Sequence, residues 1–340
     1  MTTITRTSRV VLSLLAFFAT IALARAQATE IEQEFQQLVQ KLDQWQQQIQ
    51  PLLTDKNLRP LGKVIDEARN AKTLDEQQRL SAEISQIVAA CRDAEQVAKP
   101  EDQKYLQMLI GYAYIENIGI PYNSAEAARW FSKAADQNFP EAQYILGKMY
   151  IEGAGVPKNT SKGVQLIQDA ANQNFAVAQY VLGRMLQEGT IVPANKEAAF
   201  YWLLKAARQA PIADDNTIAN AQAKTAMCYL CGDGVAKNIN EGISWMQKAA
   251  EQGLPEAQGM MGALYSTEGD IPIDYTKAMY WYKKAAAQNN AIAQYYLGRM
   301  YYYGLGVPKD KAEAIKWLQK SADQKYEEAQ AALADLLNEK

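Results

Sequence analysis

The sequence contains no histidine and only three cysteines among its 340 residues. Without histidine, the chain cannot form a Ser-His-Asp triad, a Cys-His pair or a histidine-containing metal site. Three cysteines are too few for a disulfide scaffold. The Ser-x-x-Lys and Lys-Thr-Gly motifs of penicillin-recognising serine enzymes are also missing. We therefore expect no catalytic residue, no metal and no cofactor.

Long apolar runs are missing as well, except near the N-terminus. There, Arg6 and Arg9 precede an uncharged apolar stretch from Val10 to Ala24, which is shorter than the roughly 20 residues of a membrane span. Ala24-Arg25-Ala26 has the small-x-small pattern of a cleavage site. Residues 1–26 therefore predict a cleaved export signal, with an uncleaved anchor as the alternative. We expect an exported protein, in the periplasm or alternatively secreted, without stable membrane insertion after cleavage.

No large excess of one charge is present, because the chain has 35 basic and 38 acidic residues. Cleavage after residue 26 would remove three arginines and leave 32 basic residues against 38 acidic ones. A mildly acidic protein is not attracted to nucleic acid or to an anionic membrane. We expect neither as a partner. No acidic pair stands out as the carboxylates of a glycoside hydrolase.

Residues 27–100 predict an N-terminal helical region that is rich in glutamine. Apolar residues follow a heptad spacing over residues 31–52, which predicts one helix that either docks on its neighbours or forms a dimer. A further helix is expected at 61–70, and another begins near Thr73. The inward residues of this last helix are expected to be Leu80, Ile84, Ile87, Val88 and Cys91. These helices would cover the open end of the structure that follows, as terminal caps do.

From residue 101 to residue 340 the sequence repeats. An Ala-Gln pair recurs at intervals of 36, 43, 36, 36 and 36 residues, starting at Ala142-Gln143. A period of this length is typical of stacked repeats. The longer interval contains an insertion near residues 210–216 that we expect at the surface.

Each unit predicts two helices, A and B, joined by a short loop. A column of small residues on helix A, mostly glycine, predicts close approach of a neighbouring helix, and loop glycines predict left-handed backbone. Asn or Asp precedes every helix B as an N-cap, and Glu126, Glu241 and Glu313 would complete capping boxes. We expect a structural role for the glutamine column formed by the Ala-Gln pairs. A tryptophan column on helix B is expected in the core, at positions Trp130, Leu166, Trp202, Trp245, Trp281 and Trp317.

The pattern Ala-Gln-x-x-Leu-Gly-x-Met-Tyr, Gly-x-Gly-Val-x-x-Asp and Ala-x-x-Trp-x-x-Lys-Ala-Ala resembles the Sel-one-like repeat (SLR), a relative of the tetratricopeptide repeat. The resemblance covers residues 101–340, as six units and a C-terminal half unit. It implies an all-α fold, a right-handed superhelical α-solenoid of two-helix repeats. Proteins similar to this one usually act as adaptors or scaffolds, and exported bacterial members are linked to envelope assembly, signalling or host contact.

The variable positions of helix A supply the candidate site. In tetratricopeptide-like stacks helix A lines the concave groove, so the resemblance places these positions where a protein or peptide partner would bind. The hypothesis names two charged pairs at i, i+4 spacing, which are otherwise simple surface pairs, and one aromatic patch with an arginine. The residues are Lys148, Glu152, Arg184, Glu188, Tyr295, Arg299, Tyr302 and Tyr303.

Cys228 and Cys231 form the one chemically suggestive motif. They could form a redox pair or a structural disulfide in an oxidising compartment, or remain free buried thiols. The sequence therefore favours an exported interaction scaffold that is not an enzyme. The alternatives are a cell-wall-active hydrolase of β-lactams or peptidoglycan, and a thiol-redox protein that uses Cys228 and Cys231.

Overall fold

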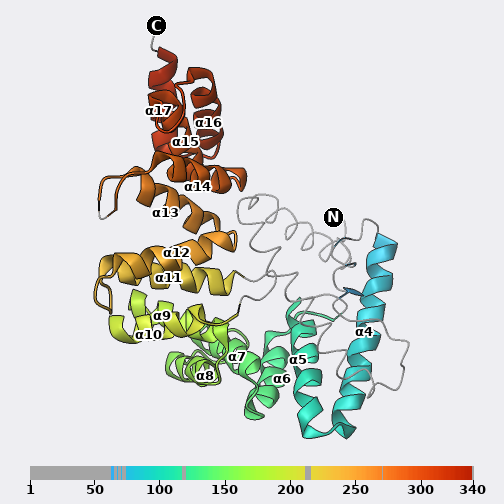
Figure 1. Cartoon of the computed structure of the whole chain (residues 1–340). Helices are drawn as coiled ribbons and strands as arrows, with labels where there is room; N and C mark the ends of the chain where they lie inside the picture. The colour runs from blue at the N-terminus through green and yellow to red at the C-terminus, as the bar shows by residue number, and fades with distance from the viewer. Residues whose placement is uncertain are drawn as a thin grey trace. The chain divides into compact units, whose positions relative to one another are not determined.

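The computed structural model describes residues 63, 64, 67, 70, 74–116, 120–210, 216–269 and 271–338. Throughout these residues the chain forms helices and no strands (Figure 1). The predicted signal at 1–26, the heptad segment at 31–52, most of the 61–70 helix and residues 211–215 of the insertion lie outside them. The helices are α4 (Leu74–Val97), α5 (Pro100–Glu116), α6 (Ser124–Asp136), α7 (Pro140–Glu152), α8 (Thr160–Asn172), α9 (Ala176–Glu188), α10 (Lys196–Ala207), α11 (Thr217–Cys231), α12 (Ile239–Glu251), α13 (Pro255–Ser266), α14 (Tyr275–Ala287), α15 (Ala291–Tyr303), α16 (Lys311–Asp323) and α17 (Glu327–Asn338).

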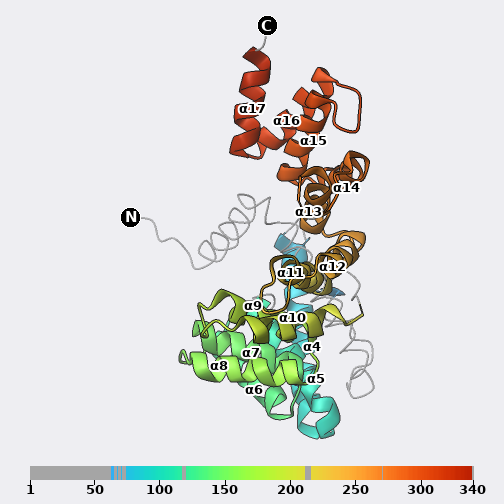
Figure 2. The ribbon, with the colours of Figure 1, turned by 60° about the vertical axis from the view of Figure 1, so that its left-hand side comes forward.

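Within each unit the helices pack in consecutive pairs. Helix A packs on helix B in α5/α6, α9/α10, α11/α12, α13/α14 and α15/α16, and each B helix also contacts the A helix that follows it in α6/α7, α10/α11, α12/α13, α14/α15 and α16/α17. Figure 2 shows the same succession from another direction. The all-α, two-helix solenoid expected from the repeats is confirmed.

The chain divides into two compact units, and the division falls inside α8. Unit 1 ends at Leu166, and unit 2 comprises Ile167–Ile212 and Asn216–Lys340. Within unit 2, the A helices α9 and α11 contact each other directly, and so do α13 and α15.

In unit 1, α4 occupies the place of a B helix before the first repeat. The predicted inward residues of α4 are all buried and belong to one cluster with the core residues of α5 and α6. The Glu95 side chain accepts hydrogen bonds from Gln107 Nε2 at 2.9 Å and from Lys133 Nζ at 3.3 Å. The Arg92 guanidinium donates to the Tyr114 hydroxyl. These contacts fit the capping role that we predicted for this region.

The small-residue column of helix A permits the predicted close approach. A Cβ added to Gly262 would lie 2.6 Å from the ring of Tyr282, and one added to Gly298 would lie 2.7 Å from Leu318. The loops also require glycine. Gly155 has a φ of 72°, and a Cβ there would lie 2.1 Å from the carbonyl oxygen of Ser124. Both requirements explain why glycine recurs despite its cost of about 1 kcal/mol in a helix.

Each predicted N-cap is confirmed, but the capping boxes are not. The side chain of every N-cap accepts a hydrogen bond from the backbone amide three residues on, at 2.9–3.1 Å. A capping box also needs the cap's own amide to bind the Glu side chain. Here the Asn123 amide instead donates to the carbonyl of Tyr114 at 3.0 Å, and the equivalent bond recurs in each repeat. Glu126 pairs with Arg129 at 2.7 Å instead.

The tryptophan column is only partly core, which corrects the prediction. Trp202 and Trp281 are buried, but Trp130, Trp245 and Trp317 are half-buried. The fully enclosed column comes one residue later, because that residue points at the small position of helix A; it consists of Phe131, Ile167, Leu203, Met246, Tyr282 and Leu318. A lysine from the next helical turn makes a cation–π contact with each Trp ring, with Nζ 3.9–5.3 Å from the ring centroid. The repeat with Leu166 in place of tryptophan has Asp169 in place of that lysine.

The buried glutamine column connects three successive helices. Gln258 Nε2 donates to the carbonyl of Ala250, at the end of the preceding B helix, at 3.0 Å. Its Oε1 accepts from Gln288 Nε2, at the end of the following B helix, at 2.8 Å. The same two bonds occur at Gln179, Gln222 and Gln294. This ladder satisfies a buried amide and fixes the spacing of the repeats.

Candidate partner-binding surface

The candidate site lies on the exposed side of the A helices, which we call the A-helix face. In unit 2 it is defined by three positions one helical turn apart on each helix. Its residues are Tyr180, Arg184 and Glu188 on α9; Ala223, Met227 and Cys231 on α11; Gly259, Ala263 and Thr267 on α13; and Tyr295, Arg299 and Tyr303 on α15.

On α15 the face is aromatic around a single cation. The Arg299 Cζ lies 5.7 Å from the ring centroid of Tyr295, 5.9 Å from that of Tyr296 and 5.8 Å from that of Tyr303. Arg299 is exposed, and Tyr303 retains 51% of its accessible surface. The spacing of 295, 299 and 303 places all three side chains on one side of the helix, so the structure brings these three predicted residues together.

Buried neighbours support this cluster from beneath. The Tyr296 ring stacks on Tyr282, with centroids 5.2 Å apart and an interplanar angle of 10°. The Tyr282 hydroxyl lies 3.0 Å from Ser266 Oγ, and burial raises the pKa of Tyr282 to about 12. Tyr295 contacts Tyr326 edge-on at 5.4 Å. Sequence reasoning did not identify Tyr296, although its adjacency to Tyr295 in a tyrosine-rich helix was a visible signal.

Tyr302 lies differently from the other three predicted residues. It is half-buried and packs against the cluster of α16 and α17 that contains Leu318 and Leu333. Its ring also contacts Tyr303 edge-on at 4.7 Å. A helix turns by 100° per residue, so position 302 is offset from the 295-299-303 line toward the next repeat. Tyr302 therefore supports the surface from its edge.

On α9 the same positions form a closed ion pair. Arg184 Nη2 and Nε lie 2.7 Å and 3.1 Å from Glu188 Oε1. The hydrogen bond to Glu188 is the largest cause of a raised pKa for Arg184. The Arg184 Cζ lies 5.9 Å from the Tyr180 ring centroid. Arg184 is thus a neutralised counterpart of Arg299, since both follow a tyrosine by one turn.

The equivalent positions in unit 1 are Lys148 and Glu152 on α7. Both are exposed. The Lys148 Nζ lies 5.8 Å from the ring centroid of Tyr144, and within the described part of the chain no ion pair joins Lys148 to Glu152. The surface pair that their spacing allowed is therefore not formed. These residues belong to unit 1, whereas α9–α15 belong to unit 2.

Cys228 and Cys231 are both free thiols on α11. Cys228 is buried, and desolvation is the main cause that raises its pKa to about 11. Cys231 is exposed, contrary to the expectation of two buried thiols. A redox nucleophile needs a lowered thiol pKa, so the environment of Cys228 is the opposite of that requirement.

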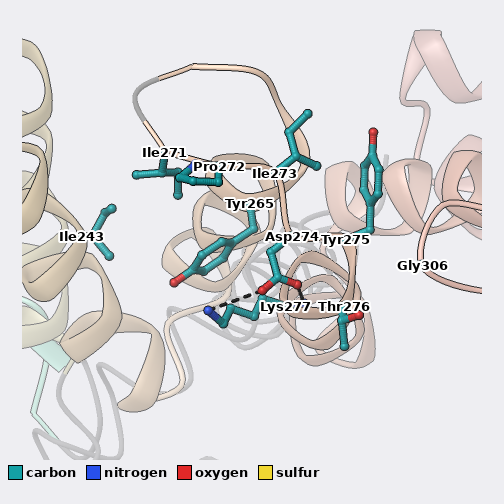
Figure 3. A pocket seen from close by; sticks show the side chains of 10 residues that line it. All are labelled: Ile243, Tyr265, Ile271, Pro272, Ile273, Asp274, Tyr275, Thr276, Lys277 and Gly306. Atoms are coloured by element: carbon teal, nitrogen blue, oxygen red, sulfur yellow. Dashed lines mark hydrogen bonds and ion pairs between the residues drawn. The ribbon is translucent and has the colours of Figure 1, made fainter.

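A hollow of about 600 Å³ opens beside the loop between α13 and α14 (Figure 3). Apolar side chains line it, including Ile243, Tyr265 and Pro272, and Lys277 lies at its edge with Nζ 3.4 Å from Asp274 Oδ2. The helix before this loop ends in an extended Thr267, whereas α7, α9, α11 and α15 are each followed by a left-handed glycine.

No cluster of three or more Cys, Asp or Glu side chains in the part of the chain that the structure describes is placed to bind a metal ion. None of the helices described is both long and apolar enough to cross a membrane.

Comparison with protein families identifies the repeat. The Sel1 repeat model matches six segments that together span more than half of the chain, at residues 105–139, 140–175, 176–211, 219–254, 255–290 and 291–326. No curated protein matches the chain by sequence.

Several solved structures are similar to this chain. A Sel1 repeat protein from Oxalobacter formigenes is 28% identical, with a TM-score of 0.60 over 82% of this chain and 86% of that one. The protective antigen c5321 of uropathogenic Escherichia coli, which has an SLR fold, is 28% identical over 81% of this chain and 67% of that one, with a TM-score of 0.43. The immunity protein Pa5087 from Pseudomonas aeruginosa is 20% identical over 66% of this chain and 88% of that one, with a TM-score of 0.37.

Proposed function

Because the chain belongs to the Sel1 repeat family, whose members are generally non-enzymatic scaffolds for protein interaction, we propose that it is an exported scaffold that binds a protein partner on its A-helix face. The role outside the cytoplasm would be in envelope assembly, signalling or host contact. The observation that carries the proposal is the exposed Tyr and Arg cluster of α15, because aromatic residues and arginine dominate binding hot spots.

The small residues of the A-helix face in unit 2 also support this assignment. On the A-helix face, α11 and α13 carry small or apolar side chains such as Ala223 and Gly259, which would let a partner approach closely. Tyr180 lies on α9 and Tyr295 on α15, the A helices before α11 and after α13.

Export rests on the sequence of residues 1–26 and stays a prediction. If the signal is cleaved after Ala26, the purified mature protein begins at Gln27, which intact mass measurement would reveal. Retention of the complete chain in the cytoplasmic fraction would contradict export, while leaving the interaction proposal standing.

The interaction itself is tested by crosslinking and affinity capture from an extract of the producing cell's envelope. We expect one or a few proteins to be recovered with the tagged chain, and to be lost when Tyr295, Arg299 and Tyr303 are all replaced by alanine. Equal recovery with this triple variant would contradict a site on the A-helix face. Purified protein that turns over a β-lactam or peptidoglycan would instead favour the enzyme alternative.

A further inference from the structure

Arg299 is an uncompensated cation on a helix that has no other charge. The sequence of α15 contains no acidic residue, and Arg299 is its single basic one. Its contacts within the described part of the chain are with the three tyrosine rings, and no carboxylate pairs with it there. Asp335 occupies the position on α17 that is equivalent to Arg299 on α15 but makes no ion pair with it.

Arg184 shows what the fold does when this position is neutralised. The two arginines occupy equivalent positions, and each follows a tyrosine by one turn. Four residues later, α9 has Glu188, which accepts two hydrogen bonds from Arg184, whereas α15 has Tyr303. Where α9 has the carboxylate of Glu188, α15 therefore has the aromatic ring of Tyr303.

A guanidinium in this setting is prepared to bind a carboxylate. Contact with aromatic rings holds the cation in place without using its N–H donors in strong hydrogen bonds. The donors match the two oxygens of a carboxylate, and such charge-assisted bonds are roughly twice as strong as neutral ones.

We propose that Arg299 binds the carboxylate of an aspartate or glutamate side chain within an extended segment of the partner, with Tyr295 and Tyr303 contacting the residues on either side. This inference rests on the proposed function. A side chain is favoured over a chain terminus because the surface continues in both directions. On one side α13 contacts α15, and on the other Tyr295 contacts Tyr326 just before α17.

The test uses capped heptapeptides that are N-acetylated and C-amidated, with mixed Leu, Tyr and Ala flanks and a central Glu, Gln, Lys or phosphoserine. Fluorescence anisotropy with the full chain should show that Glu-centred peptides bind about tenfold or more tightly than Gln-centred ones. Arg299→Gln should abolish this preference. Tyr303→Glu should do the same, because it restores the internal pair seen at Arg184 and Glu188.

Matched variants keep the result interpretable. Tyr280→Glu places the same charge on a B-helix tyrosine that is 52% exposed, close to the 51% of Tyr303, and should leave the preference for glutamate unchanged. The thermal midpoints of all three variants should match that of the parent, because the altered side chains are exposed.

Several results would overturn the inference. These are an absence of peptide binding, equal binding of Glu- and Gln-centred peptides, a preference for phosphoserine or for a free C-terminus, or a glutamate preference that survives Arg299→Gln. If a cellular partner is captured equally by the parent and by Arg299→Gln, this inference is wrong and the scaffold proposal stands. If no partner is captured by either, the scaffold proposal fails.

Discussion

At the scale of single residues, the repeat is governed by where a Cβ fits. Gly259 and Gly262 lie on the same helix, one turn apart, but differ in the space available for a Cβ. A Cβ on Gly262 would lie 2.6 Å from the Tyr282 ring, which is fully buried and stacked on Tyr296. A Cβ on Gly259 would meet only Asn290 Oδ1, at 3.9 Å. Space, rather than helix propensity, therefore decides which glycine the fold requires.

We predict that Gly262→Ala destabilises the protein by about 1–3 kcal/mol, because a buried ring cannot move aside cheaply. Gly259→Ala should be neutral or stabilising by up to about 1 kcal/mol, because alanine is the better helix former. Urea unfolding followed by circular dichroism measures both. Equal destabilisation by the two substitutions would show that close packing against Tyr282 is not the reason for the glycine.

The cysteines of α11 give a second prediction at this scale, concerning pH. At pH 8, Cys231 should react quickly with iodoacetamide, whereas Cys228 should react slowly, because burial raises its pKa to about 11 and only on the order of one thiol in a thousand is ionised. The Cys228 rate should rise with pH toward 11. Since this pKa is raised in the folded state, its contribution to stability is complete below the ordinary thiol value and is lost as pH rises through 11.

Peptide mapping of the alkylated protein distinguishes the two sites, and a Cys231→Ser variant should lack the fast phase. Two equally fast thiols would contradict the buried environment of Cys228. A mass lower by two hydrogen atoms in protein isolated without reductant would instead reveal the disulfide alternative.

At the scale of helices, the glutamine ladder couples one repeat to the next. Gln258 is only 4% exposed, and its amide bonds to both Ala250 on α12 and Gln288 after α14. Its contribution is therefore made between elements rather than within one. Because each repeat contacts only its neighbours, loss of this bond weakens an interface on which a repeat depends.

We predict that Gln258→Ala lowers the free energy of unfolding by about 1–3 kcal/mol, since it removes two buried hydrogen bonds between helices, while the Ala250 carbonyl keeps its bond from the Gly253 amide at 3.1 Å. Gln247→Ala is the matched control, because that side chain is exposed and bonds only Glu251 of its own helix, and it should change stability by less than about 0.5 kcal/mol. Hydrogen exchange should show faster opening of α12–α14 in Gln258→Ala alone. Identical exchange in both variants would contradict the coupling role.

The helices and their caps could be predicted from sequence because they depend on local patterns. Asn238 and Asp310 were assigned as N-caps from their positions alone, and both accept the expected amide. Contacts between helices were harder to predict from the sequence. The partner of Gln258 lies in another repeat, and the enclosed column, such as Tyr282 beside Trp281, depends on how far each B helix is rotated about its axis. A single period in the sequence does not fix that angle.

At the scale of the whole molecule, the proposed function depends on a surface to which several repeats contribute. The sequence identified the A-helix positions, but not which of them are neutralised internally. Arg184 and Arg299 have the same local spacing, and the structure shows that one is paired and the other is bounded by tyrosines. The repeat pattern thus predicts where a partner would bind, whereas the departures from the pattern indicate what it would recognise.

The central claim is that the A-helix face, rather than the B-helix side, contacts a partner. The most direct measurement places the photo-crosslinking residue benzoylphenylalanine at Tyr303 on α15 or at Tyr280 on α14, since these tyrosines have nearly equal exposure. After irradiation of the producing cells, we expect a defined covalent adduct from position 303 and none from position 280. An adduct from position 280 alone, or none from either position, would contradict partner binding at the A-helix face.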